Sequence, residues 1–303
     1  MTESPATGSP DEAGSSLGGP LAGFLLPDGF RRPRVAEVLR ETSLVLEAGR
    51  YAVTSLDQRR RARVTPYAAR GVSRTEEPVI LVPGFMAGDA TLRAMSRSLR
   101  RRGFRTYRAH IRANVRCTRS AADELESRIE SIAIRRGSRV QVVGHSLGGM
   151  LARGLAVRRP DLISGIVTMG SPMLAPGAHH LLLSASVDML VRLSRAGVPG
   201  LMAEDCVAGD CARQSFYESR EPLPADVSFT AIYSRRDGIV DWRACIDPVA
   251  HAVEVTASHL GMALDPRVID VVTDALHLPA YGGRPGLRPV PGSVLEVDSG
   301  ESA

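Results

Sequence analysis

The sequence predicts an α/β fold, namely a doubly wound, mostly parallel sheet with helices on both faces. Three observations predict it. Short apolar segments typical of buried strands alternate with longer amphipathic segments along the chain. The connections between them are short, and right-handed crossovers then place helices on both faces of the sheet. With 303 residues and 44% hydrophobic content, the chain is long enough to bury one large core.

Continuous apolar runs too short for helices mark the strands, and apolar residues at helical spacing mark the helices. Residues 78–82, for example, read Pro-Val-Ile-Leu-Val, whereas Leu125, Ile129 and Ile132 fall on one side of a helix over 120–135. The expected order is strand 78–82, helix 91–102, strand 105–110, helix 120–135, strand 139–143, helix 147–158, strand 165–169, then, after a long insertion, strands 228–233 and 252–255.

The two ends of the chain differ from this middle. Residues 1–30 are rich in Gly, Ser, Pro and acidic side chains and predict a flexible leader, although the apolar patch at 21–26 could dock on the body. We expect one or two amphipathic helices outside the core over 31–70. The main α/β domain spans 71–278, and repeated Pro and Gly predict a flexible tail over 279–303.

A serine stands between glycines where the strand at 139–143 meets the helix that follows it. The sequence is Gly144-His145-Ser146-Leu147-Gly148, with a further glycine next to it. A serine at such a strand-to-helix turn is held in a strained conformation, and only residues without a Cβ fit at the flanking positions. The turn lifts the hydroxyl out of the sheet, so we predict Ser146 as a nucleophile.

A serine nucleophile needs a base to take its proton and an acidic group to orient the base. In a doubly wound sheet, such groups follow the carboxyl ends of strands. His259 lies four residues past the last strand, and Asp237 lies four residues past the strand before it. We therefore predict His259 as the base and Asp237 as the acid. Asp241 is the alternative acid, and it could instead cap the turn around Gly238 and Trp242.

The negative charge of a tetrahedral intermediate needs an oxyanion hole, whose donors are worth about 3 kcal/mol each. The N–H of Leu147, directly after the nucleophile, is one expected donor. The second is expected in the loop after the first strand, where Gly84 permits a sharp turn and the N–H of Phe85 could point into the site. A tight structural turn is the alternative interpretation of this loop.

These motifs together resemble the α/β-hydrolase superfamily, specifically its lipase and esterase branch. The similar segments, in content and order, are residues 82–85, 144–149, 168–172, 233–237 and 258–262. The resemblance runs from about residue 77 to about residue 276, about two-thirds of the chain. It implies a cofactor-free serine hydrolase with Ser146, Asp237 and His259 as its triad. Many members have His-Gly where this chain has Pro83-Gly84, which is a departure at the second oxyanion donor.

The expected reaction is hydrolysis of carboxylic esters through an acyl-enzyme on Ser146, with His259 activating the water that releases the acid. Acyl transfer and thioester hydrolysis use the same residues and stay open as alternatives. A non-catalytic binding protein of the same fold is the third hypothesis, and it predicts a broken triad, whereas this sequence contains a complete set.

The insertion over residues 173–225 is far longer than an ordinary crossover, and we interpret it as a helical lid or cap. Its segment 181–193 is dense in apolar side chains. That density fits two structures equally well, a helix packed into the core and an acyl-binding cap that exposes apolar surface. The cap interpretation favours a medium or long acyl ester over a small polar one.

The formal net charge is +5, and the sequence contains no lysine. The arginine runs at 59–63 and 100–105 lack the interleaved aromatic residues of a single-strand binding platform, so we expect no nucleic-acid partner. Solvated helix surface is the favoured interpretation of the runs, and contact with phosphate or anionic lipid is the alternative. The sequence contains no stretch of about 18 consecutive apolar residues, so we expect no membrane-spanning helix. The expected partner is a small-molecule acyl ester or lipid, with transient contact to a lipid surface.

The four cysteines are Cys117, Cys206, Cys211 and Cys245. They form no Cys-x-x-Cys pair and have no histidine at metal-ligand spacing, so we expect no metal site. Their even number permits two disulfides, and Cys206 with Cys211 could close a short loop. Because the sequence does not start with a secretory signal pattern, we expect reduced thiols in a cytoplasmic protein.

Overall fold

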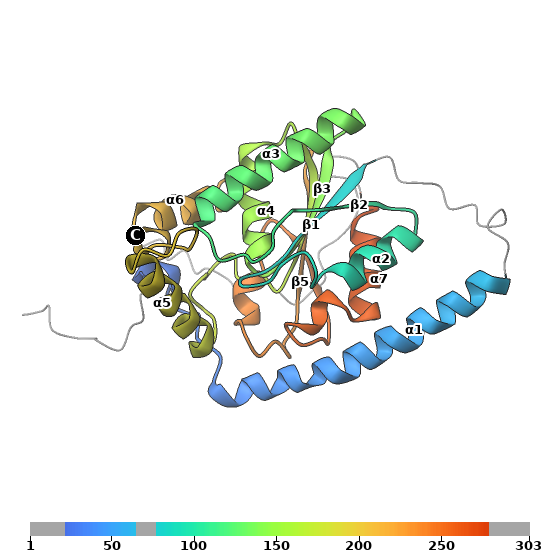
Figure 1. Cartoon of the computed structure of the whole chain (residues 1–303), viewed down its shortest axis with the longest axis horizontal. Helices are drawn as coiled ribbons and strands as arrows, with labels where there is room; N and C mark the ends of the chain where they lie inside the picture. The colour runs from blue at the N-terminus through green and yellow to red at the C-terminus, as the bar shows by residue number, and fades with distance from the viewer. Residues whose placement is uncertain (1–21, 65–76, 279–303) are drawn as a thin grey trace, which may run out of the picture.

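The structure is a computed structural model that describes residues 22–64 and 77–278, with only the backbone described for residues 58–64 (Figure 1). The predictions made for residues 1–21, for 65–76 and for the tail at 279–303 lie outside these described residues. The described residues form a central sheet with helices on both of its faces, and one long helix lies along the lower edge of the view in Figure 1.

The sheet has six strands in the order β2-β1-β3-β4-β5-β6, and every neighbouring pair is parallel. Each strand coincides within two residues with a strand predicted from the sequence, which confirms the doubly wound parallel α/β fold. The strands are β1 (Pro78–Val82), β2 (Arg105–Arg108), β3 (Val140–His145), β4 (Ile163–Met169), β5 (Ser228–Tyr233) and β6 (His251–Glu254).

Helices cover both faces of this sheet, because alternate side chains of each strand point to opposite faces. In β1, Ile80 and Val82 pack into the apolar core under α3 and α4, whereas Val79 and Leu81 pack into the core under α2 and α7. All four side chains are buried. The helices are α2 (Arg93–Arg101), α3 (Thr118–Arg136), α4 (Leu147–Arg158) and α7 (Pro266–Ala275).

Two helical elements precede the sheet, the 3₁₀ helix η2 (Val35–Ser43) and the long α1 (Leu44–Val64). They lie outside the sheet and contact α7 and the loop after β6 (Figure 1). A short turn before them, η1 (Gly23–Leu25), belongs to the predicted leader but docks on the insertion. There the Gly177 N–H donates to the carbonyl oxygen of Leu25 at 2.6 Å.

The insertion between β4 and β5 contains α5 (Leu181–Arg195), η4 (Glu204–Cys206) and α6 (Asp210–Glu218). Its apolar side chains form a cluster separate from the two cores of the sheet, composed of Val187, Leu190, Val191, Met202 and Val207. The outer side of α5 exposes further apolar residues, with Leu182 65% and Met189 52% accessible. Two short turns, η5 (Trp242–Cys245) and η6 (Gly261–Ala263), complete the fold. None of the helices in the described ranges is long and apolar enough to cross a membrane.

Candidate active site

The turn between β3 and α4 is centred on Ser146, whose backbone has φ 52° and ψ −122°. Such a conformation is strained for a residue with a side chain. The neighbouring glycines are needed because strand and helix lie very close together. A Cβ on Gly144 would lie 2.4 Å from the backbone of Gly149, and a Cβ on Gly148 would lie 2.3 Å from the carbonyl oxygen of Val82. The local sequence therefore enforces the turn that presents Ser146.

Asp237 and His259 come from the loops after β5 and β6 and form a buried pair. The Nδ1–H of His259 donates to Oδ2 of Asp237 at 2.7 Å. The other carboxylate oxygen, Oδ1, accepts the N–H groups of Ile239 at 2.8 Å and Val240 at 2.9 Å, so the carboxylate is fixed in place. This arrangement orients the imidazole and leaves its Nε2 available as a proton acceptor.

Charge around His259 raises its pKa. Burial alone would lower that pKa, but the carboxylate of Asp237, which also accepts a hydrogen bond from the ring, and the carboxylate of Glu41 outweigh burial. The pKa of His259 therefore lies above its usual value. A base with a raised pKa holds an abstracted proton more tightly, provided that the pH leaves it neutral at the start.

Asp241, the alternative acid, forms hydrogen bonds with other groups than His259. Its Oδ1 accepts the N–H of Arg243 at 3.2 Å and caps η5. Its Oδ2 accepts the N–H of Arg31 at 3.2 Å. Both oxygens therefore bind backbone donors away from the imidazole, and the geometry favours Asp237 as the partner of His259.

His145 connects the serine turn with the histidine loop. Its ring lies 4.8 Å from the ring of His259, and its Nε2–H donates to the carbonyl oxygen of His259 at 2.9 Å. Burial, together with the neighbouring His259, lowers the pKa of His145 to about 4. Within the described residues no hydrogen bond joins Ser146 to His259. Such contacts are often long before substrate binds, so the geometry remains compatible with proton transfer.

The loop after β1 passes directly over the serine turn. A Cβ on Gly84 would lie 3.0 Å from the Cβ of Ser146. Within the described part of the chain, the N–H groups of Phe85 and Leu147 meet no hydrogen-bond acceptor. The side-chain amide of Asn114 holds the loop by donating to one of its carbonyl oxygens at 3.0 Å. Backbone donors without another acceptor, on residues that line the same cavity as Ser146, are compatible with an oxyanion hole.

A carboxylate outside the predicted triad, that of Glu41 in η2, holds both loops of the buried pair. Its Oε1 accepts the N–H of Gly238 in the Asp237 loop and the N–H of His259, each at 3.0 Å. Its Oε2 accepts the N–H of Leu260 at 3.0 Å. Glu41 thus fixes the loop of Asp237 relative to the loop of His259.

A second carboxylate, that of Glu47 in α1, binds the residue before the histidine. Its Oε1 accepts the N–H of Ser258 at 2.8 Å, its Oε2 accepts the hydroxyl of Ser258 at 2.7 Å, and its side chain is buried. Sequence reasoning missed Glu41 and Glu47. A charged residue in an amphipathic helix usually marks a solvated face, and nothing in the local pattern separates these two from that case.

Ser146 opens onto a cavity of about 150 Å³ between the serine turn and the insertion. Phe85 and Leu147 also line this cavity. Most of the remaining wall is apolar and includes Met150, Leu183, Val187, Met202, Val207 and Phe216. The insertion therefore covers the serine with apolar side chains.

The second arginine run lies at the end of α2, and its side chains bind within the protein. Arg100 donates to Thr106 at 2.6 Å, Arg101 donates to Ser98 at 3.0 Å, and Arg102 pairs with Asp270. These three arginines of the run therefore have partners within the protein. The side chains of the first run, at 59–63, lie outside the described residues.

Comparisons with known proteins agree with the observed architecture. The family model described as alpha/beta hydrolase fold matches residues 77–202. A triacylglycerol lipase of Vibrio cholerae is 31% identical over 107 residues, which are 33% of this chain and 34% of that protein. This chain thus matches about a third of the length of that relative.

Solved structures show the same fold. The mature form of a Bacillus licheniformis lipase superposes with a TM-score of 0.53 at 12% identity, covering 68% of this chain and 94% of that one. The propeptide form of the same lipase gives a TM-score of 0.56 at 13% identity, and the superposition covers 71% of this chain and 54% of that one. At 12% and 13% identity, these superpositions show the shared fold.

Proposed function

We propose that this lipase- and esterase-like α/β-hydrolase cleaves carboxylic esters through an acyl-enzyme on Ser146. The observation that carries the proposal is a serine in a strained turn next to a buried Asp237–His259 pair with a 2.7 Å hydrogen bond. This combination supplies a presented nucleophile, a base and a group that orients the base.

In the proposed first step, Nε2 of His259 takes the proton of the Ser146 hydroxyl as its oxygen attacks the ester carbonyl. Asp237 stabilises the imidazolium that forms, and the N–H groups of Phe85 and Leu147 bind the oxyanion. The imidazolium then protonates the leaving alcohol. In the second step, His259 takes a proton from water, which attacks the acyl-enzyme and releases the acid.

The apolar cavity supports an acyl group as the part of the substrate that is recognised. A volume of about 150 Å³ lies below the roughly 300 Å³ at which typical small-molecule sites begin. A medium or long acyl chain therefore requires α5 or α6 to shift, and we propose that the insertion acts as a lid. The exposed apolar residues of α5, Leu182 and Met189, support transient contact of this lid with a lipid surface.

The test is hydrolysis of p-nitrophenyl esters of increasing chain length by the wild type, Ser146→Ala and the matched control Ser215→Ala. Ser215 lines the cavity but takes no part in the proposed chemistry. We expect turnover with a maximum at one chain length in the wild type and in Ser215→Ala, and none in Ser146→Ala. Retained activity in Ser146→Ala would refute the mechanism. Competing alcohols and thioester substrates in the same assay distinguish hydrolysis from acyl transfer and thioester cleavage.

A further inference from the structure

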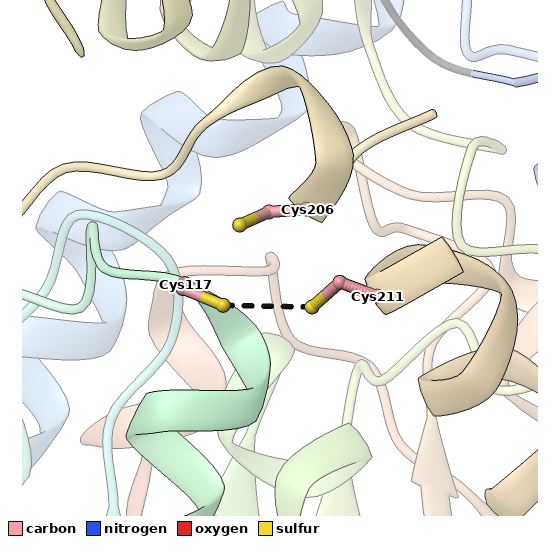
Figure 2. A group of neighbouring side chains, drawn as sticks. All are labelled: Cys117, Cys206 and Cys211. Carbon is pink, nitrogen blue, oxygen red and sulfur yellow. Dashed lines mark hydrogen bonds between the residues drawn. The ribbon is translucent and has the colours of Figure 1, made fainter. Parts of the chain in front are cut away.

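Three cysteines that are scattered in the sequence lie together in the fold. Figure 2 shows Cys117, Cys206 and Cys211 approaching one another from three separate backbone segments. The sulfur atoms all lie within 4.8 Å of one another, and those of Cys117 and Cys211 are 3.4 Å apart. The sequence spacing hid this cluster, because 94 positions separate these two residues.

The spacing of the sulfur atoms suits a metal ion bound by thiolates. In a tetrahedral zinc site with Zn–S bonds of about 2.3 Å, neighbouring sulfurs lie about 3.8 Å apart. The observed separations, from 3.4 Å up to 4.8 Å, lie on both sides of that value. Shifts of about 1 Å or less would therefore bring all three sulfurs to bonding distance of one ion.

Two of the three cysteines lie at helix N-termini. Cys117 is the N-cap residue of α3, and Cys211 lies in the first turn of α6. The positive ends of two helix dipoles therefore meet at the cluster. Cys211 is buried and the other two are partly buried, so the site is sheltered but reachable from solvent.

We propose that Cys117, Cys206 and Cys211 bind one thiophilic divalent cation, of which Zn²⁺ is the example, with a water molecule as the fourth ligand. Binding releases three thiol protons to solvent and forms three sulfur–metal bonds, and no atom changes its oxidation state. The ion joins α3 of the main domain to η4 and α6 of the insertion. Because Cys206 also lines the cavity beside Ser146, the ion fixes one wall of that cavity.

A disulfide between Cys117 and Cys211 is the competing use of the same residues. A disulfide bond would bring their sulfurs to about 2.05 Å and leave Cys206 without a role. The convergence of a third sulfur on the pair favours the metal ion, and the two states differ in metal content and in the number of free thiols.

The experiment compares the full-length wild type with Cys206→Ser and with Cys245→Ala, a matched control outside the cluster. Each protein is purified without chelator, its zinc is measured by mass spectrometry, and its thiols are counted in denaturant after the metal is removed. We expect one zinc ion per chain and four free thiols in the wild type, bound zinc in Cys245→Ala, and none in Cys206→Ser. Circular dichroism checks that each variant is folded.

A second readout is independent of zinc acquired during expression. Zn²⁺ is added at about 100 times its Kd to protein from which the metal has first been removed, and it should raise the Tm of the wild type and Cys245→Ala by about 5 °C and leave that of Cys206→Ser unchanged. If Cys206→Ser does not fold, Co²⁺ is titrated into the wild type instead. A thiolate-to-cobalt absorption band would then show that cysteine sulfurs bind the ion. The proposal is overturned if the folded wild type takes up no metal, if two thiols are missing as a disulfide, or if folded Cys206→Ser binds metal as the wild type does.

Discussion

The carboxylate of Glu41 affects His259 in two ways at once. It accepts the backbone N–H of His259, which fixes the loop, and its charge helps to raise the pKa of the ring. The residue touches neither the serine nor the cavity wall, so it acts through the base. A positioning residue of this kind should leave a signature in the pH dependence of the reaction.

We predict that Glu41→Gln moves the acidic limb of the kcat/KM profile to lower pH. The base must be neutral to accept a proton, so activity rises as the pH passes the pKa of His259. Removing a nearby negative charge lowers that pKa. The measurement is the pH profile of ester hydrolysis by the wild type and the variant.

Glu37→Gln is the matched control for this profile. Glu37 lies in the same 3₁₀ helix but pairs with Arg31 and Arg40, away from the histidine loop. Its variant should keep the wild-type profile. An unmoved acidic limb in a folded Glu41→Gln variant would show that Glu41 has no electrostatic effect on the base.

The two aspartates after β5 should differ sharply when each is replaced by asparagine. Asp237→Asn should lower kcat by about 10³ to 10⁴, because the imidazole loses the partner that sets its tautomer. Asp241→Asn keeps a capping oxygen for η5 but replaces the oxygen that accepts the Arg31 N–H by an amide nitrogen, so we expect a loss of about 1 kcal/mol in the free energy of unfolding and little loss of kcat. Steady-state kinetics and urea unfolding measure both effects, and the reverse ranking would assign the acid to Asp241.

Among single residues, the sequence predicted those that follow strand ends. Asp237 and His259 were predicted by that rule and Ser146 by its glycine-flanked turn, and the fold brings their three loops to one edge of the sheet. Glu41 and Glu47 could not be predicted, since their role depends on how an outlying helical segment docks more than 190 positions away from the loops that it binds. The cysteine cluster was hidden for the same reason.

The element that most constrains the site is the turn into α4. A Cβ on Gly148 would collide with backbone atoms of Val82 and Pro83, and backbone cannot move aside as a flexible side chain can. A Cβ on Gly154, in the same helix, would meet no atom within 4 Å. The two glycines therefore form a matched pair for testing this turn.

We predict that Gly148→Ala lowers both stability and activity, whereas Gly154→Ala leaves activity unchanged and raises stability by about 0.5–1 kcal/mol. The gain reflects the lower conformational entropy cost of alanine in a helix. The loss in Gly148→Ala reflects displacement of β1 or of the serine turn. Urea unfolding and ester hydrolysis check the pair, and equal behaviour of the two variants would contradict the tight approach of strand and helix.

Elements were predicted well where burial leaves a simple pattern. All six strands were found. The central strands β1, β3, β4 and β5 were found because parallel strands buried on both faces read as mainly apolar runs. The edge strands β2 and β6 are short and more exposed, and their place in the strand–helix alternation indicated them. Two helices, α6 and α7, were not assigned. The signal for α7 was present, since Asp265 and Pro266 form a helix start and Val268, Ile269 and Val272 follow at helical spacing. The short α6 has nine residues and a mixed polar surface, so its pattern is weaker.

For the whole molecule, buried neutral histidines should make the fold sensitive to acid. Burial lowers the pKa of both His145 and His179 to about 4, below the value of 6.5 for an exposed histidine. The unfolded chain then binds more protons, so the free energy of unfolding falls as the pH drops from about 6.5 towards 4, by about 3 kcal/mol for each residue. His259 opposes this trend, because its raised pKa stabilises the folded state at low pH.

We predict that His179→Gln loses less stability than the wild type between pH 7 and pH 5, by about 2 kcal/mol. His179 lies on the cavity wall and is not part of the proposed triad. Urea unfolding at both pH values measures the difference, and His251→Gln, at an exposed position, is the control. An unchanged pH dependence in folded His179→Gln would mean that this histidine titrates as it does in the unfolded chain.

The central claim is that Ser146 is a nucleophile activated by His259. The most direct measurement is reaction of the wild type and Ser146→Ala with a fluorophosphonate, followed by intact mass and peptide mapping. We predict a single adduct on the peptide that carries Ser146, and none in the variant. A folded wild type that stays unlabelled, or an adduct on another residue, would contradict the account.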